Sequence, residues 1–277
     1  MKRLWKFIPV LVLGFVVILI LLPQYPTQSQ SSRLIEHVIL AVEDDRSDVY
    51  PTTTSDAALS LDDQTVYLPL VVNSTGETPP PSGDGVYGTV TASGEPADGI
   101  ILSLWHDMEP ITETMTLSDG SYAFTDAPSL NVGESYSAVY MNTITPEFLN
   151  FYRTPKLNSY AAGTNVHLSD FDIGDINLIS PEDDGIETAP FEFSWNVRPE
   201  MTTDSYKLVI HNDTGFDIIY RSELLGYVGA YIINDISEVP MVLDEKYLWE
   251  VWVYSPDGGT GISHEWREIT FRSEMGN

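Results

Sequence analysis

The chain has 277 residues, of which 43% are hydrophobic, so it is long enough for one or two domains with their own cores. Lys and Arg total 13, and Asp and Glu total 41, which gives a formal net charge of 13 − 41 = −28. This negative field repels phosphate backbones and argues against nucleic acid as a partner. The absence of cysteine excludes disulfides, thiolate chemistry and CxxC zinc sites.

Residues 1–30 predict export. Lys2, Arg3 and Lys6 precede an uncharged apolar run at residues 7–22, and this order is typical of a Sec-type signal peptide. No clear small-residue cleavage motif follows the run, so an uncleaved membrane anchor with its basic end in the cytoplasm is an open alternative. With either outcome, we expect the rest of the chain to be extracellular or on the cell surface.

Residues 31–83 predict a disordered linker rich in Pro, Ser, Thr and Asp. Residues 33–42 have helical spacing, but the run is too short to predict a stable helix by itself. Residues 66–72 (VYLPLVV) are β-prone, and Pro69 suits an edge strand or a docked linker. Three consecutive prolines at residues 79–81 stiffen the end of the linker.

From residue 84 onward the sequence is a succession of short apolar or alternating runs, each bounded by Gly, Pro, Asp, Asn or Ser. One series fills residues 84–179 and a second fills residues 180–274. Helical periodicity does not appear between the runs. The sequence therefore predicts an all-β chain with two β-sandwich domains in tandem after the N-terminal segment and the linker.

A serine pair, an acid and a glycine in residues 117–122 (LSDGSY) raise the question of an active-site loop. Asp119-Gly120 lies between two strand-like runs, and Asp-Gly is a strong signal for a hairpin turn because glycine accepts a positive φ. A catalytic Ser121 needs a base, and no histidine is near in sequence. We therefore interpret the segment as a turn.

The first series resembles a carboxypeptidase regulatory-like domain, a relative of transthyretin and of the B-type repeats of bacterial adhesins. The resemblance rests on Gly-x-Val at residues 88–90, on a Gly-x-Pro-x-x-Gly turn at residues 94–99, and on Asp-Gly-Ser-Tyr-x-Phe at residues 119–124. It implies structural glycines, with Tyr122 and Phe124 in the core, and it brings no catalytic residue.

The second series resembles a fibronectin type III or related immunoglobulin-like domain. Leu243, Tyr247, Trp249 and Val251 have the layout of a tyrosine-corner strand. The resemblance implies that the Tyr247 hydroxyl bonds to the backbone upstream. The period of two in this run independently places Trp249 and Val251 on one face, toward the core.

Two sets of residues are candidate sites. The acids near the junction of the two series are crowded, which favours a solvated acidic surface. The alternative is a calcium site that uses Asp170, Asp172, Asp175, Asp183 and Asp184, because calcium prefers carboxylate and carbonyl oxygens. Aromatic residues that the cores do not need could instead stack on a sugar, and the candidates are Trp252, Tyr152 and Tyr160. Their alternative role is to pack the two domains together.

No other pattern in the sequence points to chemistry. The five histidines are scattered without metal-ligand spacing, and Gly-x-Ser-x-Gly and phosphate-loop motifs are absent. The sequence therefore predicts an exported bacterial surface or accessory protein without enzyme activity, which acts in adhesion or extracellular interaction. Its partner would be an extracellular protein or a polysaccharide, and calcium is the only candidate cofactor. The alternative function is carbohydrate binding through exposed aromatic residues.

Overall fold

The computed structural model describes residues 84–142, 144–214 and 217–273. All of the described residues belong to one compact unit. The predicted signal or anchor and the predicted linker lie outside the described residues. None of the helical structure in the described ranges has the length and apolar character needed to cross a membrane.

The described residues form an all-β structure, which confirms the fold class that the short alternating runs predict. In these ranges the only helical element is the 3-10 turn η1 (Ile236–Glu238). In chain order the strands are β1 (Gly85–Ala92), β2 (Glu95–Pro96), β3 (Ile101–His106), β4 (Glu109–Met115), β5 (Ser121–Phe124), β6 (Tyr136–Met141), β7 (Phe151–Arg153), β8 (Asn165–His167), β9 (Phe171–Asp172), β10 (Leu178–Ser180), β11 (Gly185–Thr188), β12 (Phe191–Trp195), β13 (Ser205–Asn212), β14 (Ile218–Arg221), β15 (Ala230–Ile233), β16 (Lys246–Tyr254), β17 (Thr260–Ile262) and β18 (Arg267–Arg272).

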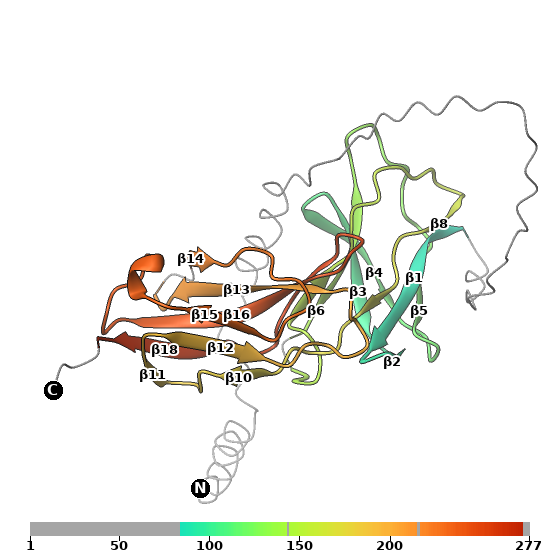
Figure 1. The fold of residues 1–277 in the computed structure, drawn as a ribbon. Coiled ribbons are helices and arrows are strands. Elements are labelled where there is room, and N and C mark those ends of the chain that lie inside the picture. The colour runs from blue at the N-terminus through green and yellow to red at the C-terminus, as the bar shows by residue number, and fades with distance from the viewer. Residues whose placement is uncertain (1–83, 143, 215–216, 274–277) are drawn as a thin grey trace, which may run out of the picture. The chain divides into compact units, whose positions relative to one another are not determined.

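These strands form three sheets (Figure 1). In the five-stranded sheet, β1 pairs with β2 and β5 in antiparallel fashion and with β8 and β9 in parallel. The three-stranded sheet has the order β10-β12-β15. The ten-stranded sheet, called the large sheet below, has the order β11-β18-β16-β17-β7-β6-β3-β4, with β13 added to β16 and β14 to β13.

The two smaller sheets pack on one side of the large sheet, which is called its inner face. Tyr152 of β7 stacks on Phe171 of the five-stranded sheet, with 4.7 Å between ring centroids. Phe193 of the three-stranded sheet meets Trp249 of β16 edge-on at 5.3 Å. All four rings belong to one buried cluster. These aromatic contacts pack the five-stranded sheet and the three-stranded sheet against the same large sheet, as the two layers of a β-sandwich pack against each other.

The large sheet crosses the predicted boundary between residues 179 and 180. Strand β7 pairs with β17 in antiparallel register, with Gly261 opposite Tyr152. Gly261 permits this approach, because a Cβ there would lie 2.7 Å from Leu149 Cδ1 and 3.0 Å from Tyr152 Cδ2. The sequence predicts two sandwiches that follow one another, whereas the structure joins strands of both halves into one hydrogen-bonded sheet.

The Asp-Gly segment is a turn, as predicted, but it does not close a hairpin. Gly120 has φ +78° and its N–H donates to the carbonyl of Leu117 at 2.8 Å. The Asp119 carboxylate accepts from the N–H and the hydroxyl of Ser121 at 3.0 and 2.6 Å. Strand β4 pairs with β3 and strand β5 pairs with β1, so the turn carries the chain from the large sheet to the five-stranded sheet.

The tyrosine corner forms as the period of two and the fibronectin-like layout imply. The Tyr247 hydroxyl accepts a hydrogen bond from the Val242 N–H at 2.6 Å, five residues upstream. Trp249 and Val251 are fully buried on the inner face. The residue between them, Glu250, and the next one after Val251, Trp252, point to the opposite side of the large sheet, called its outer face.

Candidate functional site

The five aspartates expected to bind calcium do not come together. In the described part of the chain, no group of three or more acidic or histidine side chains is placed to hold a metal ion. Each carboxylate instead has its own partner: Asp170 accepts from the Thr89 N–H, Asp172 from the Gly94 and Gly174 N–H groups, Asp175 from the His264 N–H, Asp183 from the Glu268 N–H, and Asp184 from Lys246. Local amides and cations therefore hold these carboxylates apart, and calcium binding stays a prediction.

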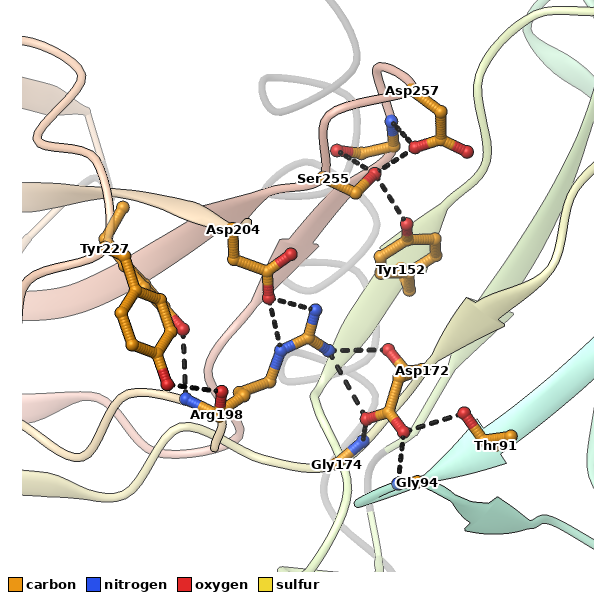
Figure 2. A network of polar contacts seen from close by, with 12 residues as sticks. Thr91, Gly94, Tyr152, Asp172, Gly174, Arg198, Asp204, Tyr227, Ser255 and Asp257 are labelled. Carbon is orange, nitrogen blue, oxygen red and sulfur yellow. Dashed lines mark hydrogen bonds and ion pairs between the residues drawn. The ribbon is translucent and has the colours of Figure 1, made fainter. Parts of the chain in front are cut away.

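One of these aspartates belongs to a buried network, called the ionic joint, made of Asp172, Arg198 and Asp204. Figure 2 shows the Arg198 guanidinium between the two acids. Arg198 donates to Asp204 Oδ2 through Nε at 2.9 Å and through Nη2 at 2.6 Å. Its Nη1 donates to the Asp172 carbonyl at 2.6 Å and lies 3.6 Å from Asp172 Oδ1. Asp172 is the last residue of β9, Arg198 follows β12, and Asp204 precedes β13, so the joint links both halves of the sequence.

The electrostatics of the ionic joint favour an ionised network. Burial alone would lower the pKa of Arg198, but the carboxylates of Asp204 and Asp172 outweigh it and raise that pKa. Burial raises the pKa of Asp204, while the guanidinium acts to lower it. Because two short hydrogen bonds connect the pair, we describe both groups as charged. A buried charge without its partner is costly, so the joint fixes how the two halves meet.

Further hydrogen bonds connect the residues of the ionic joint to neighbouring side chains (Figure 2). The Asp172 carboxylate accepts from the Thr91 hydroxyl at 2.8 Å, which ties it to β1. The Tyr227 hydroxyl donates to the Arg198 carbonyl at 2.9 Å. Nearby, the Tyr152 hydroxyl lies 3.0 Å from the Ser255 hydroxyl, which in turn bonds to Asp257. No sequence motif indicates the joint, because Arg198 is separated by 26 residues from Asp172.

The three aromatic residues expected to bind a sugar are buried. Trp252 is 0% exposed, Tyr152 is 1% exposed and Tyr160 is 4% exposed. Trp252 does point away from Trp249, as strand alternation predicts, but its indole N–H donates to Glu250 at 2.5 Å on a covered face. The expectation that these rings are exposed is wrong, because both faces of the large sheet are buried around β16 and β7. A sugar cannot reach the three rings from solvent in this structure.

Asp175 is the one junction acid with a strongly shifted protonation equilibrium. Burial raises the pKa of its carboxyl to about 7, against the hydrogen bond from the His264 N–H at 2.7 Å. The nearby charge of Glu265 also raises this pKa. The carboxyl therefore changes its charge near neutral pH. A carboxyl with a raised pKa is a candidate functional group, but burial of a carboxyl with a purely structural role raises its pKa in the same way.

The open edge of the large sheet at β4 carries exposed apolar side chains. Ile101 is 61% exposed and lies opposite Met115, which is 59% exposed, across the β3–β4 pair. Ile111 of β4 and Met141 of β6 are also exposed. Within the described residues β4 pairs only with β3, so one side of its backbone is open. An open strand edge with apolar side chains is a site for strand addition by another chain.

No family model matches the chain, and no curated protein matches it. Among solved structures, the chain is similar to a DUF3823 family protein from Bacteroides ovatus, with 14% identity and a TM-score of 0.28 over 68% of this chain and 98% of that chain. It is also similar to CopC from Methylosinus trichosporium, with 15% identity and a TM-score of 0.24 over 37% of this chain and 98% of that chain. TM-scores this low carry no inference about function.

Proposed function

We propose that this chain is an exported, non-catalytic surface protein that binds an extracellular protein by strand addition at β4. The exposed apolar side chains on this open edge support the proposal most directly. The basic residues and apolar run at the N-terminus support export. As part of the proposal, the first half is a carboxypeptidase regulatory-like sandwich and the second a fibronectin type III-like sandwich, both serving as scaffold.

The backbone geometry of β4 is suited to a further strand. The Thr116 N–H donates to the Ile100 carbonyl at 2.9 Å, and the register continues with Leu102 opposite Thr114. Because antiparallel pairs alternate, the N–H groups of Glu113 and Met115 point to the open side. The Thr116 hydroxyl donates to the Ala97 carbonyl at 2.6 Å and holds the end of this edge in place.

The side chains of β4 define the chemistry of the partner. Ile111 and Met115 offer apolar contacts on one side of the strand, and Glu109 and Glu113 add two negative charges. Glu113 and Met115 are two residues apart and therefore share one face of β4, so a strand that carries a basic and an apolar residue two positions apart on that face fits both features. Side-chain pockets and charge pairs would then give specificity, while the backbone ladder gives affinity.

A peptide experiment with the full chain tests the proposal. The probe is an immobilised twelve-residue peptide that repeats Val-Thr-Lys-Thr, which puts Val and Lys by turns on one face, and the same peptide with Glu in place of Lys is the charge control. We expect saturable binding to the Lys peptide, weakened by about tenfold or more in Glu113→Pro, because proline removes an outward N–H. Glu113→Ala keeps that N–H and is the matched control, which should lose far less.

Two results would contradict the proposal. Equal binding by Glu113→Pro and Glu113→Ala would show that the backbone edge is not used. Binding to a polysaccharide panel that persists in Glu113→Pro, with calcium or with a chelator, would instead support the carbohydrate-binding alternative. Export is tested separately, by adding protease to intact cells that produce the chain: degradation is expected, and full protection would exclude surface exposure.

A further inference from the structure

Two tyrosine side chains meet at the rim between the large sheet and the three-stranded sheet. Tyr220 lies on β14, which within the described residues pairs only with β13 and so ends one branch of the large sheet. Tyr231 lies on β15, an end strand of the three-stranded sheet. The register places Tyr220 opposite Ile210 and Tyr231 opposite Phe193, and both of these partners belong to the buried core. The two tyrosine rings therefore reach toward each other from the inner faces of two layers.

The hydroxyl groups of this pair contact each other. The oxygens of Tyr220 and Tyr231 are 2.6 Å apart, which is a short hydrogen bond. The ring centroids are 6.3 Å apart, with 37° between the ring planes. This centroid distance is shorter than an end-to-end arrangement of two phenols would allow, so the rings are inclined toward each other. The carbon atoms beside the two hydroxyls are thereby brought within reach of small side-chain rotations.

A second tyrosine pair shows how this contact differs from ordinary packing. Tyr206 and Tyr227 have the same centroid separation, 6.3 Å, with 48° between the ring planes. Their hydroxyls, however, turn to the backbone of Arg198: Tyr206 accepts from its N–H at 3.0 Å, and Tyr227 donates to its carbonyl at 2.9 Å. Among the tyrosine pairs in ring contact in the described ranges, only Tyr220 and Tyr231 have their hydroxyls bonded to each other.

Two phenols held in this way are suited to oxidative coupling. Loss of one electron and one proton turns each phenol into a tyrosyl radical, and two radicals in contact form a bond between the ring carbons beside the hydroxyls. The net reaction removes one hydrogen from each ring, while one hydrogen peroxide, used by a haem peroxidase, is reduced to two waters. Contact within one molecule makes the coupling step unimolecular. Burial and the hydrogen bond to Tyr231 raise the pKa of Tyr220, so this phenol keeps its proton at neutral pH.

We propose that Tyr220 and Tyr231 form a site of oxidative modification, at which a dityrosine bond joins β14 to β15 and ties the large sheet covalently to the three-stranded sheet. Both side chains are half-buried, so a small oxidant can reach the pair while the rings stay in contact. The chain has 15 tyrosines and no cysteine, so a disulfide cannot supply such a tie. Export would bring the chain to an oxidising compartment, but strand addition at β4 plays no part in this reaction.

Treatment of the folded full chain with hydrogen peroxide and a haem peroxidase, followed by trypsin and mass spectrometry, tests this site. Trypsin cuts after Arg221, so it separates the two tyrosines into the peptides 208–221 and 222–246. The cross-link keeps these peptides together, with a mass two hydrogens below their sum. We expect this joined product from the parent at low protein concentration. Its yield should fall by about tenfold or more in Tyr220→Phe and in Tyr231→Phe, because phenylalanine keeps the ring but lacks the phenol that must be in contact.

Tyr227→Phe is the matched control, because Tyr227 lies in the same tryptic peptide as Tyr231 but its hydroxyl bonds to Arg198. This variant should keep the joined product. A comparison of the parent in buffer and in urea needs no variant, and the yield should fall severalfold when the fold is lost. Absence of the product from the folded parent overturns the inference. A product that persists in Tyr231→Phe, or one that forms equally well in urea, also overturns it.

Discussion

The two faces of the large sheet are both buried, yet they differ in chemistry. On β16, Trp249 and Val251 point inward and join aromatic rings of the smaller sheets. The alternate residues Glu250 and Trp252 point outward, among Arg221, Lys207 and a histidine. The inner face is a core, whereas the outer face has the mixed composition of an interface. Burial alone therefore does not identify a core, and the pattern of charges is needed as well.

The largest expected effect separates the two faces by truncating one tryptophan on each. Trp249→Ala should lower the free energy of unfolding by about 3–5 kcal/mol, because it opens a cavity between packed sheets. Trp252→Ala should cost at least as much, because it also removes the indole N–H that donates to the buried Glu250 carboxylate. Urea unfolding followed by circular dichroism measures both. A smaller cost for Trp252→Ala than for Trp249→Ala would show that the polar contacts of the outer face add nothing to its packing.

The second prediction concerns the ionic joint on the inner side. Arg198→Ala should lower the free energy of unfolding by about 3–5 kcal/mol, because Asp172 and Asp204 remain buried without their cation. Arg272→Ala, which breaks an exposed pair with Asp244, is the control and should cost less than about 1 kcal/mol. If the two variants lose the same stability, the joint does not hold the halves together.

The sequence predicts the strands and the tyrosine corner well, since both are local. Alternation over residues 246–254 predicts the strand, and the resemblance of Leu243, Tyr247 and Trp249 to the fibronectin type III layout implies the corner. It does not predict the shared sheet, because the pairing of β7 with β17 depends on residues more than one hundred positions apart. The exposure of Trp252 was also mispredicted, because a period of two gives the direction of a side chain and not what covers it.

The candidate sites also depend on contacts between distant residues, which the sequence does not predict. Five acids near one joint suggest a cation site only if their side chains converge, and local amides hold them apart instead. No sequence motif marks the ionic joint, since its three residues are separated in sequence and Asp and Arg are common residue types. Edge strand β4 was visible as a short run, but its open edge follows from the order of the sheet, which the sequence does not state.

The third prediction concerns the dependence of the free energy of unfolding on pH, which measures the cost of ionising the buried Asp175 carboxyl. The Asp175 carboxyl has a pKa of about 7 in the folded chain, against an ordinary value of 3.8. Between these values the folded chain holds a proton that the unfolded chain has lost, so stability falls as pH rises from about 4 to about 7. Asp175→Asn removes this fall, and its advantage over the parent should grow by about 1.4 kcal/mol per pH unit across that window and then level off.

Urea unfolding of both proteins at several pH values checks this prediction. The difference between Asp175→Asn and the parent is used because other carboxyl groups titrate equally in both. At about pH 4 the two should have similar stability, since the parent carboxyl is then neutral. A difference that stays constant from acid to neutral pH would show that Asp175 is not held protonated by burial.

The smallest expected effect is at the tyrosine corner, where a single hydrogen bond joins the inner face to the backbone. Tyr247→Phe keeps the ring against Phe271 and removes only the hydroxyl that accepts from the Val242 N–H. The free energy of unfolding should fall by about 1 kcal/mol, the net value of one such bond. Hydrogen exchange gives the sharper reading: the Val242 amide should exchange faster, while the Ser263 amide, which donates to the Val251 carbonyl, should keep its rate. Equal acceleration at both amides would mean that the hydroxyl supports β16 as a whole, and the inner face would then depend on this corner as much as on its aromatic packing.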